Sequence, residues 1–397
     1  MDNTMLDTFY KNNIKLTKDE TKDILDFVKP KIDYIVQYIH ERDKRFKLRP
    51  LNVGSYYSRL KVSRADEFDY SVVLDSGPYL VWTTQTPAFS ACDTILGNTE
   101  VVRTSSSLPS APVGKCVTKL SRSIPQWNKK RMNEGSDCLT IGDHIIPMKV
   151  KKRFQALVIE AIKQPLISRY VDAKRSSGSP AVTLTIADPD ADDVEPISVD
   201  LAPLIEAHLP FKPEFNWPRP QARWPSSTQI KDIQDEGIHL VAKDPEYWTL
   251  SFVTCEKKLL ESTETTGTCR NKSHRIMKKL CEIWCPEGTK QVLNSYHIKN
   301  IYFWECEYHP DDWEWTKKQL AVRVESMCDL LIKYIDDRNL PVYFHTGINL
   351  FKNYLTDQQV FDNVQKEIRT FWENPEDYLR DYMEEEEEEE EDDDDFY

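Results

Sequence analysis

One short run, EFDYSVVL, constrains the fold more than any other part of the sequence, because it alternates acidic and aromatic side chains. Glu67 and Asp69 are separated by Phe68 and followed by Tyr70. Successive side chains of a β-strand point to opposite faces. The run therefore predicts a strand with an aromatic face directed to a core and an opposite face that carries two carboxylates.

Two carboxylates this close repel each other unless a cation lies between them. Mg²⁺ is the natural cation, because it binds one or two carboxylates together with substrate phosphates. Gly54 and Ser55 precede the acids and offer a close backbone approach and donors for a phosphate chain. Asp200 follows the apolar run 197–199 and supplies a third acid. The alternative at this point is a solvent-facing edge strand preceded by an ordinary Gly-Ser turn.

Length and composition favour a globular intracellular protein. The 397 residues, 40% of them hydrophobic, suffice for two packed domains or one large bilobal unit. No apolar run reaches the roughly 18 residues of a membrane span, and the first residues lack the pattern of a signal peptide. The nine cysteines have no paired spacing, which fits a reducing compartment. We expect a cytoplasmic protein without membrane contact.

Most of the net negative charge can be assigned to one segment near the end of the given sequence. Residues 384–395 are all Glu or Asp, so they carry twelve of the charges behind the net value of −14 and leave −2 for the rest. Such a block repels itself and buries nothing, which predicts disorder over 381–397. It is either a solubilising tail or a polyanion mimic that competes for a basic groove.

Apolar periodicity predicts a mixed α/β first part and a helical second part. A long amphipathic helix is expected within 16–47, with a capping box at Thr17 and a kink near Pro30. Strands are expected at 69–75 and 181–186, whereas 76–145 has no clear pattern. From about residue 230 the pattern is helical, most clearly at 255–263, 274–284, 296–307 and 316–335. The predicted division is 1–210, 211–380 and the tail.

A set of short motifs, taken together, resembles a known enzyme family. The motifs lie in the family's order at 53–74, 178–186, 197–202, 224–229, 248–260, 276–278, 295–299 and 348–351. The chain resembles the cyclic GMP-AMP synthase-like receptors, members of the Mab-21-type nucleotidyltransferase family. The resemblance implies an α+β fold with a mixed-sheet catalytic lobe, an all-helical C-terminal lobe and an active site in the cleft between them.

The resemblance also implies a reaction and a set of residues. Two Mg²⁺ ions, or Mn²⁺ instead, would be held by Glu67, Asp69 and Asp200 while two NTPs such as ATP and GTP are joined into a cyclic dinucleotide. The residues expected to contact the nucleotides are Gly54, Ser55, Glu256, Lys278, Ser295 and Tyr296. From the residues alone, Tyr296 would instead be an ordinary aromatic on a helix face.

Three departures from the vertebrate synthase affect product and metal. Ala202 stands where the synthase has Thr, and Thr249 stands where it has Arg, so the bases and the linkage of the product are open. The zinc thumb is missing. Structural zinc is not expected, because the spacing of the remaining Cys and His residues does not match a standard zinc site; these residues are Cys269, His274, Cys281 and Cys285.

The family's activator is double-stranded nucleic acid, which implies innate immune, antiviral sensing. Without a thumb, double-stranded RNA is favoured over double-stranded DNA, because an A-form helix is recognised by its shape and backbone. A dimer on the activator is the assembly that the resemblance suggests. Basic residues that could bind phosphates are Lys18, Lys22, Lys29, Lys31, Arg42, Lys44, Arg45, Lys47, Arg270, Lys272, Arg275 and Lys279. The alternative is a solvated helix face.

Two other functions compete with the cyclic dinucleotide synthase. The first is a catalytically silent relative that acts as a binding scaffold in development, like the male-abnormal proteins of the same family. The second is an enzyme of the oligoadenylate synthase type, which makes linear chains with the same three acids. The complete set of acids favours an enzyme, and the motifs at 178–184 and 295–299 favour the cyclic product.

Overall fold

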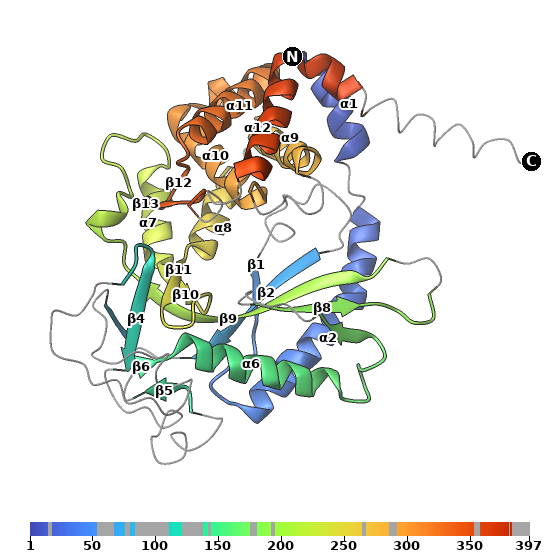
Figure 1. The fold of residues 1–397 in the computed structure, drawn as a ribbon, viewed down its shortest axis with the longest axis vertical. Helices are drawn as coiled ribbons and strands as arrows, with labels where there is room; N and C mark the ends of the chain where they lie inside the picture. The colour runs from blue at the N-terminus through green and yellow to red at the C-terminus, as the bar shows by residue number, and fades with distance from the viewer. Residues whose placement is uncertain are drawn as a thin grey trace, which may run out of the picture.

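The structure, a computed structural model, consists of a lower lobe built on a β-sheet and an upper lobe of helices (Figure 1). It describes residues 1–14, 18–53, 67–75, 80–83, 111–120, 138–141, 144–174, 181–191, 195–263, 267–285, 292–352, 358–380 and 382. Gly54, Ser55, Thr17 and the acidic segment 384–395 lie outside the described residues.

The sheet carries the predicted acids on neighbouring strands. The order of its longest path is β1-β2-β9-β10-β11-β4-β6-β5, and β8 also pairs with β9. Among the described strands only β2 and β9 pair in parallel. The strand bounds are β1 Leu51–Val53, β2 Glu67–Leu74, β3 Leu80–Thr83, β4 Lys115–Leu120, β5 Thr140–Ile141, β6 His144–Ile145, β7 Val171–Ala173, β8 Val182–Ile186, β9 Ile197–Leu209, β10 Ile238–Val241 and β11 Trp248–Ser251.

Two helices, α2 (Lys18–Arg42) and α6 (Pro147–Ile162), pack together in the lower lobe (Figure 1). Along α2, Val28, Ile32, Ile35 and Ile39 recur every three or four residues and are fully buried. This spacing aligns them on one helix face, and each stabilises the fold by about 1.5–3 kcal/mol through burial. The core stripe of α2 is therefore the one that the sequence predicts.

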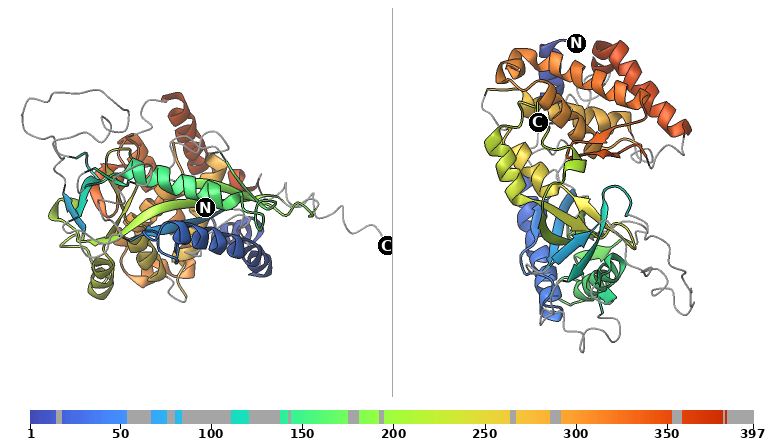
Figure 2. Two further views of the ribbon diagram at one scale, coloured as in Figure 1. Left: turned by 90° about the horizontal axis from the view of Figure 1, so that it is seen from below. Right: turned by 90° about the vertical axis from the view of Figure 1, so that its left-hand side faces the viewer.

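In the described part of the chain, helices α9 to α12 pack against one another in the upper lobe, which also carries a hairpin. Most helices bury one face and expose the other. In contrast, α10 buries residues on most of its circumference, including Ile298, Ile301 and Phe303. Helices α9 and α11 pack against it, and Figure 2 shows the helices stacked above the sheet. The bounds are α8 Val253–Glu261, α9 Arg270–Trp284, α10 Ser295–Tyr308, α11 Leu320–Asp336, α12 Gln358–Glu373, β12 Pro341–Val342 and β13 His345–Asn349, and α7 (Ser227–Glu236) packs against α8.

The first helix, α1 (Asn3–Asn13), packs on the upper lobe rather than on the sheet (Figure 1). Leu6 and Phe9 are fully buried there. Arg275 of α9 donates to the backbone carbonyl of Ile14 at 2.9 Å, and Lys272 pairs with Asp7. The start of the chain is thus attached to the helices that its last third forms.

Most of the predicted elements are confirmed, and one expectation is wrong. Strands lie at both predicted positions, and α2, α8, α9, α10 and α11 occupy the predicted helical segments. The helical pattern expected from about residue 230 is interrupted at 238–241 and 248–251 by strands β10 and β11, which join the large sheet. Both strands are four residues long, too short to establish a period. The division of the chain at 210 stays a prediction.

None of the helices in the described part of the chain combines the length and the apolar character that a membrane span requires.

Candidate active site

Asp69 and Asp200 lie directly beside each other on neighbouring strands. In the parallel pair of β2 and β9, Asp69 is opposite Asp200, and in the antiparallel pair of β9 and β8, Asp200 is opposite Thr183. Neighbouring strands are about 4.8 Å apart, so these three residues form a row across the sheet. Two predicted acids that are far apart in the sequence are therefore brought together by the register.

Burial shows which face of the sheet the row occupies. Phe68 and Tyr70 flank Asp69 and are buried, as are Val199 and Leu201 on either side of Asp200. The two acids are half-buried and lie on the opposite face. Two like charges side by side disfavour the folded state unless a cation or donors compensate them, so this face of the row suits a cation.

Thr183 compensates part of the charge of Asp200. Its hydroxyl donates to Oδ1 of Asp200 at 2.6 Å. The other oxygen, Oδ2, accepts no hydrogen bond from the described residues. One carboxylate oxygen is thus held by the protein and one is available to a cation. The sequence gives no direct sign of this contact, because a threonine in a strand is common.

The remaining residues of the predicted metal and phosphate site are only partly described. Glu67 is the first residue of β2 and pairs with Ser198, but its side chain lies outside the described residues. Strand β1 ends at Val53, which is opposite Asp69. The chain therefore enters the Gly54-Ser55 segment beside one of the acids. The placement of both residues themselves stays a prediction.

A second cluster of predicted residues forms around Glu256 on α8. Glu256 is buried, and its Oε2 accepts a hydrogen bond from Nζ of Lys299 at 2.9 Å. Desolvation, together with the charge and hydrogen bond of the Glu256 carboxylate, holds the pKa of Tyr296 well above its usual range. Lys299 also lies 5.4 Å from the centre of the Tyr296 ring. Glu256 and Tyr296 are thus brought together, and Lys299 joins them.

Lys278 and the buried His274 extend this cluster into α9. Burial lowers the pKa of His274 well below its usual range, and the nearby charges of Lys278 and Lys299 lower it further. The imidazole stacks on Tyr302 with ring centres 4.3 Å apart, and neither ring nitrogen has a hydrogen-bond partner among the described atoms. Burial and the nearby positive charges thus favour the uncharged form of the His274 imidazole.

Helix α8 connects the second cluster to the sheet. It follows strand β11 directly and packs against β1 and β10. The strand that leads to Gly54 and the helix that carries Glu256 are therefore neighbours, as Figure 1 also shows. Ser295 is exposed and begins α10, one residue before Tyr296. The predicted nucleotide-contacting residues of the upper lobe thus lie on α8, α9 and the start of α10.

The two positions that differ from the vertebrate synthase both lie on the sheet. Ala202 is half-buried on the same face of β9 as Asp200, two residues further along the strand. Thr249 lies on β11 and pairs with Val241 of β10 and Lys115 of β4. A methyl group therefore stands beside the acids where the synthase has a hydroxyl.

The thiols considered as zinc ligands are buried in the upper lobe. Burial raises the pKa of Cys269 to about 11. Cys281 and Cys285 are one helical turn apart, and their mutual hydrogen bond, together with burial, raises the pKa of Cys281 well above its usual range. Zinc binds the thiolate, which these environments disfavour. Within the described segments, no three His, Cys, Asp or Glu residues are placed to hold a metal ion.

Several of the basic residues considered for nucleic-acid binding have partners inside the protein. Arg270 is buried and pairs with Asp312, while Lys272 and Arg275 hold α1. Arg45 is buried beside Asp43. On the side of α9 that faces α1, these cations already contact groups of the chain itself, and binding of nucleic acid by the predicted basic residues stays a prediction. The exposed basic residues of α2 and the loop after it include Lys22, Lys29, Arg42 and Lys44.

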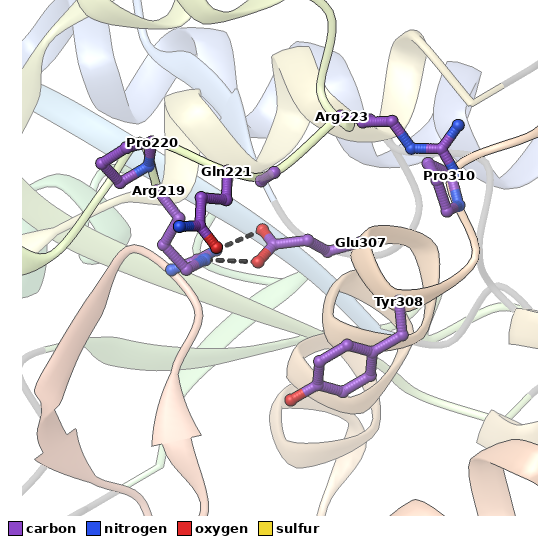
Figure 3. A pocket seen from close by; sticks show the side chains of 8 residues that line it. Arg219, Pro220, Gln221, Arg223, Glu307, Tyr308 and Pro310 are labelled. Carbon is purple, nitrogen blue, oxygen red and sulfur yellow. Dashed lines mark hydrogen bonds and ion pairs between the residues drawn. The ribbon is translucent and has the colours of Figure 1, made fainter.

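A surface cavity of about 570 Å³ lies between the segment 219–223 and the end of α10 (Figure 3). None of its lining residues belongs to the predicted site. Arg219 donates to Glu307 at 2.6 Å and, through Nη1, to the carbonyls of Asn216 and Tyr343. Arg223 pairs with Asp311. Because both guanidinium groups are already neutralised, the cavity does not offer a free cation to an anionic ligand.

A mixed sheet with paired acids, joined to a helical lobe, defines the nucleotidyltransferase fold. Comparison with family models matches residues 56–262 to the "Mab-21 protein nucleotidyltransferase domain" and residues 269–370 to the "Mab-21 protein HhH/H2TH-like domain". The chain belongs to the Mab-21 family.

Among the curated proteins similar to this chain are two that carry the same name. "Protein mab-21-like 3" of Danio rerio is 32% identical over 255 residues, which is 64% of this chain and 62% of the relative. The protein of the same name from Xenopus laevis is 28% identical over 260 residues, 65% of this chain and 66% of the relative. The chain therefore spans less than two thirds of either relative.

Proposed function

We propose that the protein is a nucleic-acid-activated nucleotidyltransferase that joins two NTPs into a cyclic dinucleotide. Within the family this makes it a cyclic GMP-AMP synthase-like receptor, an enzyme of the EC 2.7.7 type that makes a second messenger in innate immune defence. The proposal combines the demonstrated family with the motifs of the sequence and the geometry of the acids.

The observation that carries the proposal is the direct juxtaposition of Asp69 and Asp200 on one half-buried face. A scaffold gains nothing from two neighbouring carboxylates on the same face, because their repulsion lowers stability. An enzyme that transfers a nucleotidyl group needs such a pair to hold cations against a triphosphate. The residues present therefore fit Mg²⁺, with Mn²⁺ as the alternative ion.

In this proposal Asp69 and Asp200, with Glu67, hold the cations at the row of acids. Mg²⁺, when bound, supplies charge neutralisation on the triphosphate and makes an acceptor ribose hydroxyl more acidic. The carboxylates align the acceptor so that its oxygen bonds to the α-phosphorus while the bond to pyrophosphate breaks; the hydroxyl proton passes to solvent. A second turn of the same reaction closes the ring.

The remaining residues have binding roles in the proposal. Gly54 and Ser55 hold the triphosphate. Tyr296 stacks on a base, and its hydroxyl is oriented by Glu256, which the perturbed pKa of Tyr296 supports. Lys278, beside His274, and Ser295 contact the phosphates or the second nucleotide. Ala202 and Thr249 leave the choice of bases and linkage open, so uridine is a candidate as well as adenosine and guanosine.

The proposed activator is double-stranded RNA, with double-stranded DNA as the second choice, in the cytoplasm. The absence of the zinc thumb from the sequence favours RNA, which is recognised by shape. The exposed basic residues of α2 are the proposed contacts, and a dimer on the activator is the proposed assembly. Binding there depends strongly on salt and little on sequence.

Nucleotide binding separates the enzyme from the silent scaffold. We expect the wild-type protein to bind a non-hydrolysable NTP in the presence of Mg²⁺ and to bind it much more weakly in EDTA. Asp69→Asn removes the Mg²⁺-dependent part, whereas the matched control Asp190→Asn, an exposed acid paired with Arg169, keeps it. Isothermal titration calorimetry measures NTP binding by the wild type, Asp69→Asn and Asp190→Asn. Binding of the same strength with and without Mg²⁺ would argue against the proposal.

A further inference from the structure

The hydroxyl of Thr183 is placed to orient one of the proposed metal-binding carboxylates. Thr183 lies on β8 directly opposite Asp200, and Asp69 lies on the far side of Asp200 in the same row. The hydroxyl donates to Oδ1 of Asp200 at 2.6 Å, a short distance for an O–H···O⁻ bond. The contact therefore belongs to the class of strong, charge-assisted hydrogen bonds.

We infer that Thr183 is a positioning residue, which fixes the Asp200 carboxylate so that Oδ2 alone is presented to the cation; this inference rests on the proposed function. It adds a residue of β8 to a site whose other acids come from β2 and β9. Thr183 itself touches neither the cation nor the nucleotide in this arrangement.

The geometry of Mg²⁺ explains why such a residue is needed. Mg²⁺ demands nearly octahedral coordination and keeps several waters, so a carboxylate that binds through both oxygens is unfavourable. The hydrogen bond from Thr183 makes Oδ1 a poorer ligand and leaves Oδ2 as the oxygen with both lone pairs open to the cation. Threonine suits the task because its branched side chain has few χ1 rotamers. The donor is consequently held in place before the cation arrives.

The cost of losing this hydrogen bond is known from comparable arrangements. Removing the hydrogen-bond partner of a metal-binding side chain typically lowers metal affinity or activity by about 10–100-fold. Thr183 is half-buried, so water competes with it less than at an open surface. We expect Thr183→Val to weaken cation binding by roughly 10–100-fold.

The valine substitution separates positioning from a purely structural role. Valine has nearly the same shape and suits a β-strand, so β8 keeps its packing. Thr183→Ser keeps the hydroxyl group and removes only the methyl group. Thr185→Val is the matched control, because Thr185 lies two residues further on the same strand and face but is opposite the uncharged Ser198.

The experiment measures Mn²⁺ binding to the full chain by electron paramagnetic resonance, in the absence of nucleotide. The expected result is equal affinity in the wild type, Thr183→Ser and Thr185→Val, a 10–100-fold loss in Thr183→Val, and no binding at this site in Asp200→Asn. Circular dichroism confirms that each variant is folded.

Two results would overturn the inference in different ways. Equal Mn²⁺ affinity in Thr183→Val and the wild type would remove the role of Thr183 and leave the proposed function intact. Failure of the wild type to bind Mn²⁺ any better than Asp200→Asn would instead remove the metal site and with it the proposed function.

Discussion

Asp43 provides a quantitative test of how the lower lobe is held together. This carboxylate lies just after α2 and is 2% exposed. It accepts hydrogen bonds from Nε and Nη2 of Arg45 at 2.8 and 2.6 Å and from Nε of Arg153, on α6, at 3.2 Å. One buried acid thus ties the end of α2 to α6. The substitution Asp43→Asn removes its charge and keeps its size.

The expected loss of stability follows from the burial of the partners. Arg45 is 1% exposed, so the substitution removes the negative charge that Asp43 places beside a buried guanidinium group. Breaking a buried ion pair in this way costs about 3–5 kcal/mol. The amide oxygen of asparagine still accepts one hydrogen bond, which favours the lower end of that range. About 3 kcal/mol corresponds to roughly a 100-fold change in the ratio of folded to unfolded protein.

Urea denaturation followed by circular dichroism measures this loss. With an m-value of about 1–3 kcal/mol/M, the midpoint of the transition is expected to fall by roughly 1–3 M. Asp33→Asn is the control, because Asp33 pairs with Lys29 on the exposed side of α2, where the side chains are 49% and 63% exposed. That pair contributes about 0.3–0.5 kcal/mol. Equal shifts for both variants would refute the argument from burial.

The same cluster predicts a dependence on pH. Burial by itself raises the pKa of Asp43, but the hydrogen bonds and charge of Arg45, with Arg153, lower the pKa overall. A lowered pKa contributes stability that is complete above the unfolded value, about 3.9, and is lost as pH falls through the folded value. The difference between wild type and Asp43→Asn should therefore be constant near neutrality and shrink below about pH 4.

Three further predictions concern the upper lobe and the tail. Glu256→Gln weakens the contact with Lys299 and removes the charge beside Tyr296, so we expect at least ten-fold weaker NTP binding by calorimetry, with unchanged circular dichroism. Phe9→Ala removes a fully buried ring between α1 and the upper lobe and should cost about 3–5 kcal/mol in thermal unfolding. Deletion of 384–395 should lower the activator concentration needed for half-maximal activity if the acidic segment competes with polyanions; an unchanged dose response would retire that idea.

Local patterns in the sequence predict much of this fold. The apolar stripe of α2 and the alternation around Asp69 are local, because each depends on residues a few positions apart. The long helices α9 and α11 give enough turns for a period to show. The four-residue strands β10 and β11 do not, and their place in the sheet is decided by pairing with β9 and β4 rather than by their own sequence.

The same distinction between local sequence patterns and long-range contacts applies to the candidate site. Spacing and neighbouring motifs in the sequence predict Glu67, Asp69 and Asp200 as the site acids, and the register of β2 and β9 places Asp69 beside Asp200. The contacts of Thr183 with Asp200 and of Lys299 with Glu256 join residues 17 and 43 positions apart, and only the sheet register and helix packing create them. The hydrogen bonds of Arg275 to Tyr10 and Ile14 are equally non-local, because they join residues more than 260 positions apart.

The most direct test of the account is product analysis by chromatography and mass spectrometry. Purified protein is incubated with all four NTPs and Mg²⁺, with and without double-stranded RNA or DNA. The account predicts a cyclic dinucleotide that requires one of the nucleic acids, persists in Asp190→Asn and is lost in Asp69→Asn and Asp200→Asn. A product that persists in both acid variants would contradict the central claim that these two carboxylates carry the reaction.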